Sequence, residues 1–211
     1  MAKLYKNILN AEETELIRSI PDCIRDRFYL AGGTGLALQI RHRYSYDFDF
    51  FSDTEFNNDV IIKELTHLGK FRRFQESRGT LEGTVKNTRI TLLYYNYPLL
   101  KKVTRFETIM LASLLDIAVM KISALSSRGS RKDFIDLYFL KDYFKWQEEL
   151  IPAFKEKYKG TGYNLYHIIK SLSYFTEAEE EPMPQMIRSC SWSDVKQYCK
   201  SIQKELADTY L

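Results

Sequence analysis

The sequence predicts an α+β protein, with a mixed sheet and flanking helices in the first half of the chain and helices alone in the second. Three short runs with strand-like composition follow one another in the first half, and residues suited to tight turns separate them. After about residue 106 the apolar residues recur at helical spacing only. We therefore expect an α/β domain over residues 1–105 and a helical domain over residues 106–211.

The elements of the first half each have a local signal. Residues 11–20 carry apolar positions at helical spacing behind three glutamates, which predicts an amphipathic helix. Residues 27–31 form a short apolar run that ends at Gly32 and Gly33, so a strand should run into a turn, and Thr34 can cap the helix that follows. The other expected elements are strands at 46–51, 72–76, 80–86 and 88–95 and a helix at 58–68.

The second half is expected to be helical throughout. A long apolar helix should end at the Ser-Ser-Arg-Gly-Ser break of residues 126–130, and the segment 177–184, with four Glu and two Pro, is expected to be an exposed loop. The predicted helices span residues 108–126, 131–144, 146–158, 163–175 and 191–207.

The composition is ordinary for a soluble globular protein, with 45% hydrophobic residues, 28% charged residues and a net charge of +3 over 211 residues. This charge permits a nucleic-acid partner without favouring one. No apolar run is long enough for a membrane span, and the first lysines precede no apolar segment, so neither a membrane protein nor a secretory signal is expected. Cys23, Cys190 and Cys199 show no zinc spacing, and we expect them to be reduced in a cytoplasmic protein.

A glycine turn is the first candidate for a binding site. Gly32 and Gly33 would let the backbone approach a ligand closely, and the amides of the following helix N-terminus attract phosphate. Such a turn also occurs for purely structural reasons. Arg41, His42 and Arg43 follow the helix, as a basic rim that could meet phosphates or as a solvated helix end.

Asp47-Phe48-Asp49 is the second candidate. Alternate residues of a strand share a face, so Asp47 and Asp49 should point one way and Tyr46, Phe48 and Phe50 towards the core. Two carboxylates about 7 Å apart repel each other unless a cation lies between them, and oxygen ligands favour Mg²⁺ or Mn²⁺. The alternative is a solvated pair at the edge of a strand.

Lys121 is the third candidate, because apolar residues surround it on its predicted helix. A buried ammonium needs a negative partner, which a nucleotide phosphate could supply, unless the side chain reaches the surface. Arg128, Asp133 and Asp136 follow at the helix break. The two aspartates should share one helix face, and Ser130 with Asp133 resembles a capping box.

Together these constellations resemble the AbiEii/AbiGii family of nucleotidyltransferase-like toxins. The order and spacing fit over residues 28–140, a little over half the chain, whereas residues 141–211 carry only a generic helical pattern. The matching stretches are Ala-Gly-Gly-Thr-Gly-Leu-Ala-Leu-Gln from Ala31, Arg43, Asp47-Phe-Asp-Phe-Phe-Ser, Lys121, Arg128 and Lys132-Asp-Phe-Ile-Asp-Leu-Tyr.

The resemblance implies a polymerase-beta-like nucleotidyltransferase fold followed by a helical domain that completes the active site. It implies that Gly32, Gly33 and Thr34 hold the phosphates of a nucleoside triphosphate (NTP). It also implies that Asp47 and Asp49 are catalytic residues that bind Mg²⁺ or Mn²⁺.

For the second half, the resemblance implies that Lys121 and Asp133 belong to the catalytic set. Arg43, Lys121 and Arg128 would then contact the nucleotide. The family consists of toxins of toxin–antitoxin pairs, and some relatives modify tRNA ends, so a separately encoded antitoxin and an RNA acceptor are the implied partners.

One feature departs from the nucleotidyltransferase pattern. Many of these enzymes carry a third carboxylate on a later strand, where it helps to activate the attacking hydroxyl, but residues 88–95 contain no acid. Glu82 on the preceding strand, Asp133 or Asp136 are the alternatives for the general base.

The expected function is metal-dependent transfer of a nucleoside monophosphate from an NTP to an acceptor, which could be RNA or tRNA, a protein or a small molecule. A basic surface for RNA is one option, although scattered solvated cations are the commoner outcome. The alternatives are a catalytically degenerate fold that binds protein or RNA, and a small-molecule kinase. The residues proposed for the basic surface are Arg72, Arg73, Lys101, Lys102 and Arg105.

Overall fold

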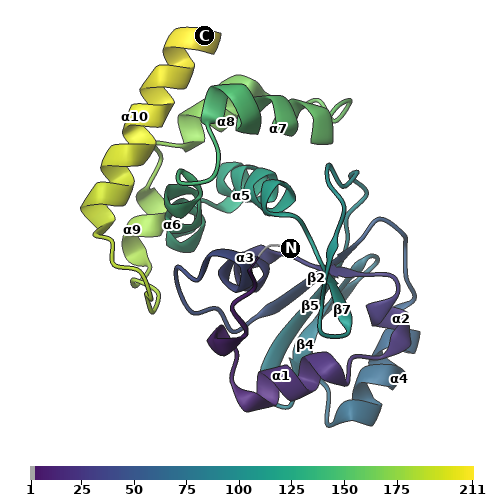
Figure 1. The fold of residues 1–211 in the computed structure, drawn as a ribbon. Coiled ribbons are helices and arrows are strands. Elements are labelled where there is room, and N and C mark those ends of the chain that lie inside the picture. Colours follow the sequence, from purple (N-terminus) through teal and green to yellow (C-terminus); the bar gives the residue numbers. More distant parts are fainter. Residues whose placement is uncertain (1–2) are drawn as a thin grey trace. The chain divides into compact units, whose positions relative to one another are not determined.

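The computed structural model describes residues 3–211, which divide into two compact units (Figure 1). The sheet unit contains the chain up to Arg41 together with Ser45–Leu114, and the helical unit contains His42–Tyr44 together with Leu115–Leu211. The predicted α+β class, with a mixed sheet and a helical C-terminal region, is confirmed. The domain boundary expected after residue 105 falls within the strand Thr104–Phe106, and this strand and Ile109–Leu111 complete the sheet.

The sheet unit is built on one seven-stranded mixed sheet in the order β3-β4-β5-β2-β1-β7-β6. The pairs β2–β5 and β1–β7 are parallel and the other neighbours are antiparallel. The strands are β1 Tyr29–Leu30, β2 Phe48–Ser52, β3 Arg72–Ser77, β4 Thr80–Val85, β5 Thr88–Tyr94, β6 Thr104–Phe106 and β7 Ile109–Leu111.

The two faces of the central strands differ in burial. Phe48, Phe50, Leu81, Ile90 and Leu92 are fully buried on one face, while their neighbours along each strand are half-buried or exposed. This alternation is the period-two pattern of a sheet with one face packed on the core. Charged and hydroxyl side chains of β2, β4 and β5 can therefore share the opposite, more open face.

Short capped helices complete the sheet unit. Asn10 and Glu13 form a capping box at the start of α1, and Asn57 accepts hydrogen bonds from the first amides of α4. Helix α4 contacts β4 and lies beside it in Figure 1. The helices are η1 Lys6–Ile8, α1 Ala11–Arg18, α2 Asp22–Arg25, α3 Gly32–Ile40 and α4 Asn58–Leu68.

Two local predictions for the first half are wrong. The strand predicted from residue 46 begins at Phe48, where pairing with Ile90 of β5 starts, so Tyr46 lies outside the ladder and is 51% exposed. Thr34 does not cap α3, because the helix already begins at Gly32 and Ala31 holds the cap position.

The helix predicted over residues 108–126 is wrong in its first turns. Its apolar start forms β7, the second strand of the β6–β7 hairpin, in which Ile109 and Leu111 are buried and Met110 is 37% exposed. This alternation is a strand pattern, and Glu107 with φ +50° makes the turn. The helix itself, α5, begins at Leu114.

The helical unit holds the rest of the chain. Phe134, Phe175 and Trp192 bring α6, the start of α9 and α10 together, with ring centroids 4.8 to 5.9 Å apart. Part of the predicted loop at residues 177–184 is helical, as α9. The helices are α5 Leu114–Arg128, α6 Arg131–Leu140, a π-helical turn η2 Trp146–Leu150, α7 Ile151–Lys157, α8 Leu165–Ser171, α9 Thr176–Glu180 and α10 Trp192–Tyr210.

Candidate functional site

The glycine turn packs directly against one predicted metal ligand. Gly32 opens α3 with φ +60°, a left-handed conformation that strains residues with a side chain. A Cβ built on Gly32 would lie 3.0 Å from the Cβ and Cγ of Asp49, and closer still to its Oδ2. Only glycine leaves room for this carboxylate beside the helix N-terminus.

The turn is also tied to the segment that carries Asp47. The Thr34 hydroxyl is fully buried and donates to the backbone oxygen of Asp47 at 2.5 Å. The Ala31 amide donates to the backbone oxygen of Asp49 at 3.0 Å. Asp49 lies within β2 and Asp47 just before it, and both are partly exposed. The structure thus brings the predicted phosphate turn and both predicted metal ligands together in the sheet unit.

A further carboxylate lies on the same sheet face as Asp49. Asp49 is in register with Thr91 of β5, and Thr91 is in register with Glu82 of β4. Because neighbouring strands lie about 4.8 Å apart, the Cα atoms of Glu82 and Asp49 are separated by about 10 Å. The Glu82 carboxylate accepts a 2.5 Å hydrogen bond from Arg89, whose side chain is 52% exposed.

The residues predicted for the second half meet in a buried charge cluster of the helical unit, made of His42, Arg43, Lys121, Arg128, Ser130, Asp133 and Asp136. Lys121 of α5 is 6% exposed, and its ammonium lies 2.7 Å from Asp133 Oδ1 and 2.7 Å from Asp136 Oδ2. The negative partner that burial demands is therefore this pair of carboxylates on α6.

Asp136 is the centre of the cluster. Arg43 donates to it from Nε at 2.7 Å and from Nη2 at 2.9 Å, and His42 Nε2 lies 2.7 Å from Asp136 Oδ1. A carboxylate only accepts, so the His42 proton is assigned to Nε2. His42 is fully buried and Arg43 is 2% exposed, so neither forms the solvated rim that the sequence suggested.

Asp133 has a second set of donors. Its Oδ2 accepts from Ser130 Oγ at 2.8 Å and from Arg128 Nε at 3.1 Å. Ser130 also accepts from the Asp133 amide as the N-cap of α6, so half of the predicted capping box is formed. Arg128 is the most accessible cation of the cluster, with a side chain that is 66% exposed.

These contacts fix the ionisation states of the cluster. Burial alone would raise the pKa of both aspartates, but the neighbouring cations outweigh it, and the pKa of Asp136 falls well below its usual value. Burial opposes the charge of Lys121, yet Asp133 and Asp136 raise its pKa. Burial lowers the pKa of His42, so the ring is neutral at pH 7.

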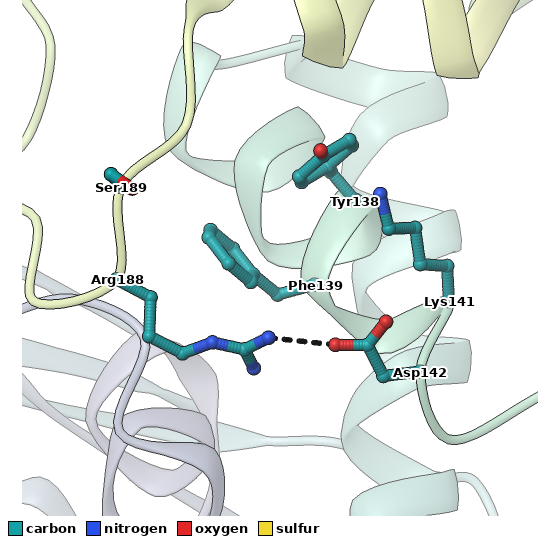
Figure 2. A pocket seen from close by; sticks show the side chains of 6 residues that line it. All are labelled: Tyr138, Phe139, Lys141, Asp142, Arg188 and Ser189. Carbon is teal, nitrogen blue, oxygen red and sulfur yellow. Dashed lines mark hydrogen bonds and ion pairs between the residues drawn. The ribbon is translucent and has the colours of Figure 1, made fainter.

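The segment of residues 181–189 is bonded to the backbone of the residues that carry His42 and Arg43. Its backbone bonds to that of residues 42–44, including Tyr44 N to Gln185 O at 2.9 Å and Ile187 N to His42 O at 3.0 Å. Figure 2 shows Arg188 at its end, where the guanidinium donates to Asp142 at 2.8 Å and lies 4.7 Å from the ring centre of Phe139. These residues line a hollow of about 490 Å³, together with Tyr138, Lys141 and Ser189.

The remaining predicted cations lie elsewhere. They all belong to the sheet unit and are exposed, and Lys101 and Lys102 line a second hollow of about 590 Å³. Arg73 pairs with Glu76 on its own strand. The five residues are Arg72 and Arg73 of β3, Lys101 and Lys102 before β6, and Arg105 of β6.

The site chemistry fits a divalent cation only in part. Asp47 and Asp49 offer oxygen ligands, which magnesium prefers, beside a turn that only glycine can occupy. Within residues 3–211, no group of three or more His, Cys, Asp or Glu could hold a metal ion alone. Two carboxylates suffice when substrate phosphates and water complete the coordination, as is usual for magnesium.

Some organising residues were not assigned by the sequence. The central role of Asp136 and the burial of His42 depend on contacts over more than 90 positions of the chain. A second buried ion pair, Lys157 with Asp116 at 3.0 Å, joins α7 to α5 and was not predicted. The described helices include none long and apolar enough to cross a membrane, and the three cysteines are free thiols.

Comparison with known proteins defines the class. The fold is that of nucleotidyltransferases: MenT4, a nucleotidyltransferase toxin of Mycobacterium tuberculosis, aligns with a TM-score of 0.58 and 13% identity over 92% of this chain and 79% of that one. JHP933 from Helicobacter pylori aligns with a TM-score of 0.53 and 16% identity over 98% and 96% of the two chains.

Sequence comparison then gives the family. A model described as "Nucleotidyl transferase AbiEii toxin, Type IV TA system" matches residues 23–101. An uncharacterised protein of Aquifex aeolicus is 36% identical over 210 residues, which cover 97% of this chain and 98% of that protein. The chain belongs to the AbiEii family of nucleotidyltransferase toxins of type IV toxin–antitoxin systems.

Proposed function

We propose that the protein transfers a nucleoside monophosphate from an NTP to an acceptor hydroxyl, with pyrophosphate as the leaving group. The observation that carries this proposal is the contact between Gly32 and Asp49, which supports a phosphate turn and a metal ligand within one site. Thr34 strengthens the arrangement through its hydrogen bond to the Asp47 backbone.

Asp47 and Asp49 would hold magnesium or manganese. The bound ion would neutralise negative charge on the phosphate group that is transferred. Gly32 and Gly33 would leave the first amides of α3 accessible to the triphosphate, and the helix dipole favours its negative charge. The site would thus bind phosphate through the backbone amides of α3 and the cation through the carboxylates of Asp47 and Asp49.

Glu82 is our choice for the general base among the three alternatives. Asp133 and Asp136 are fully buried, accept several hydrogen bonds each and have lowered pKa values, which disfavours proton abstraction. Glu82 shares the open sheet face with Asp49, and its partner Arg89 is exposed enough to release it. In this assignment Glu82 supplies the carboxylate that β5 lacks.

In the helical unit, Lys121 and Arg128 are proposed to contact the nucleotide phosphates. Arg43 and Asp133 would support them through the buried charge cluster. The partners proposed from family membership are an NTP, an RNA, protein or small-molecule acceptor and a separately encoded antitoxin, in the cytoplasm. The exposed cations Arg72, Arg73, Lys101, Lys102 and Arg105 would favour an RNA acceptor over a neutral one.

Thermal melting with each NTP and magnesium tests the nucleotide site. We expect one or more NTPs to raise the melting temperature of the wild type, and Asp49→Ala to abolish this shift. Asp53→Ala is the matched control, because Asp53 is an exposed carboxylate just after the same strand. Absence of a shift with every NTP would reject the enzymatic proposal and favour the alternative, a degenerate fold that binds protein or RNA.

Labelled substrates test the reaction and its base. Incubation with α-³²P NTPs and total RNA should place label on RNA if RNA is the acceptor, and pyrophosphate rather than a nucleoside diphosphate should be released. Glu82→Gln should abolish transfer while the melting shift persists. Glu76→Gln is its control, because Glu76 is in register with buried Leu81 and faces the other side of the sheet.

A further inference from the structure

The two hairpins formed by β3, β4 and β5 carry the excess positive charge of the protein. Residues 70–89 contain six cations and two carboxylates, a net charge of +4, whereas the whole chain carries +3. All six cations are exposed. The rest of the chain is therefore almost neutral, and the charge is concentrated on one part of the sheet unit.

Half of these cations are neutralised by carboxylates. The ion pairs are Arg73–Glu76, Arg78–Glu55 and Arg89–Glu82. Among residues 3–211, no carboxylate lies within ion-pair distance of the other three, Lys70, Arg72 and Lys86. The positive excess therefore belongs to these three side chains.

These cations lie at one end of the two hairpins. Arg72 is in register with Thr84, and Thr84 with Arg89, so both arginines belong to one row across the strands. A Cβ built on Gly69 would lie 3.5 Å from the Cγ of Lys86, so the chain just before β3 runs beside the β4–β5 turn. We call this group the basic patch, made of Lys70, Arg72, Lys86 and Arg89.

Lys86 occupies a turn position that does not favour lysine. Lys86 and Asn87 join β4 to β5 with φ +47° and +63°, as in a two-residue turn of type I′. Such turns prefer Asn, Asp or Gly, because both central residues need a left-handed conformation. The lysine side chain is exposed and forms no ion pair within the described chain. Its ammonium is thus available to a partner outside the fold.

The basic patch adjoins the candidate site on the open sheet face. Thr84 and Glu82 share one face of β4, so the row of Arg72 and Arg89 lies beside the row that aligns Glu82 with Asp49. The three strands that carry the second row lie side by side in Figure 1. Rows two residues apart along a strand are separated by about 7 Å. A chain bound to the patch can therefore reach the site along the same face.

Arg89 connects the patch to the candidate base. Its Nη2 donates to Glu82 Oε1 at 2.5 Å, while its side chain remains 52% exposed. A guanidinium has five N–H donors, so Arg89 can bind a phosphate with those that Glu82 does not occupy.

The surrounding surface favours a nucleic acid over a protein partner. The core of a protein interface is apolar and depleted in lysine, whereas β3 is exposed along its whole length and has one apolar residue, Phe74. Phe74 is 54% exposed and lies at the bulge between Arg73 and Gln75, and such a bulge disfavours pairing with a further strand. Cations beside an exposed aromatic ring suit phosphates and a stacked base.

We propose that the basic patch binds the phosphates of a single-stranded nucleic acid and positions it along the open sheet face towards Glu82 and Asp49, with Phe74 stacking on a base. The inference deepens the proposed function, on which it rests only in making the bound strand the acceptor. The acceptor is then a phosphodiester chain, and neither a protein hydroxyl nor a small molecule.

Fluorescence anisotropy with a labelled single-stranded RNA of about 20 nucleotides tests the patch in the absence of NTP. The triple variant Lys70→Gln, Arg72→Gln and Lys86→Gln should bind the RNA at least tenfold more weakly. The slope of log K against log salt should become shallower by about 2, because each lost phosphate contact contributes about 0.7. Phe74→Ala should weaken binding roughly tenfold through lost stacking.

A second triple variant is the matched control. Lys159→Gln, Lys200→Gln and Lys204→Gln remove the same charge from exposed positions of the helical unit and should leave RNA affinity within about twofold of the wild type. Because all the substituted cations are exposed, both triple variants should keep the wild-type melting temperature. Equal weakening in both would show that only net charge matters and would overturn the inference.

Two further outcomes separate the partners and the functions. Polyglutamate that binds as tightly as the RNA would overturn the nucleic-acid assignment in favour of an acidic protein. A wild type that shows a melting shift with an NTP but does not bind RNA would overturn the inference and leave the proposed function intact. RNA binding that depends on the patch, without a melting shift for any NTP, would support the surface and reject the proposed function.

Discussion

Substitution of Gly32 by alanine tests the tightest contact of the site. An alanine at φ +60° costs about 1–2 kcal/mol in backbone strain. Its Cβ would also meet the Asp49 side chain, with 3.0 Å to Cβ and Cγ and less to Oδ2. Because the shortest approach involves the end of the side chain, the carboxylate must rotate away from the turn. We therefore expect a small loss of stability and a complete loss of the magnesium–NTP melting shift.

Gly160→Ala is the matched control for this substitution. Gly160 has φ +82°, and a Cβ there would meet nothing within 4 Å. Urea unfolding should show a loss of about 1–2 kcal/mol from backbone strain in both variants, and melting with magnesium and each NTP should show a shift only in Gly160→Ala. A full shift in Gly32→Ala would refute the claim that this glycine makes room for a ligand-binding Asp49.

Three further substitutions or titrations follow from the same contacts. Thr34→Val removes the hydrogen bond to the Asp47 backbone and should cost about 1 kcal/mol in urea unfolding; an unchanged midpoint would contradict it. Lys157→Met removes the ammonium that lies 3.0 Å from the fully buried Asp116 carboxylate and should cost about 3–5 kcal/mol, most of which Asp116→Leu should restore in the double variant. The pKa of Asp136 lies below its ordinary value of 3.8, so its contribution to stability is present above that pH and lost as the pH falls through the lower folded-state value. Circular dichroism of an acid titration should therefore show unfolding below about pH 4, and Asp136→Asn should make the transition shallower.

Local signals were sufficient for most elements of the sheet unit. The helix predicted at residues 58–68 coincides with α4, and the strands predicted at 72–76, 80–86 and 88–95 match β3, β4 and β5 to within a residue or so at each end. Alternation and turn residues determine these elements within a few positions of the chain. A short apolar run such as Ile109 to Leu111 fits both the helical and the strand period, so its pattern alone does not determine the secondary structure.

The sheet half of the candidate site was also within reach of the sequence. Gly32, Asp47 and Asp49 lie within 18 residues of one another, and a strand, a turn and a helix are enough to bring them together. The sequence does not predict which strand pairs with β2. The alignment of Glu82 with Asp49 depends on parallel pairing of β2 with β5, whose register is fixed by side chains on the buried face.

Part of the charge cluster is predictable from the sequence, because two neighbouring helices carry buried charges of opposite sign. Lys121 on an apolar helix requires an anion, and Asp133 and Asp136 on another apolar helix require cations. Each requirement is visible in the sequence, and the two helices are separated by a short break. Pairing these unmet requirements predicts the Lys121 contacts without any tertiary information. It does not predict Arg43, because that residue lies 93 positions from Asp136, and only the folded chain shows that its charge belongs to the same cluster.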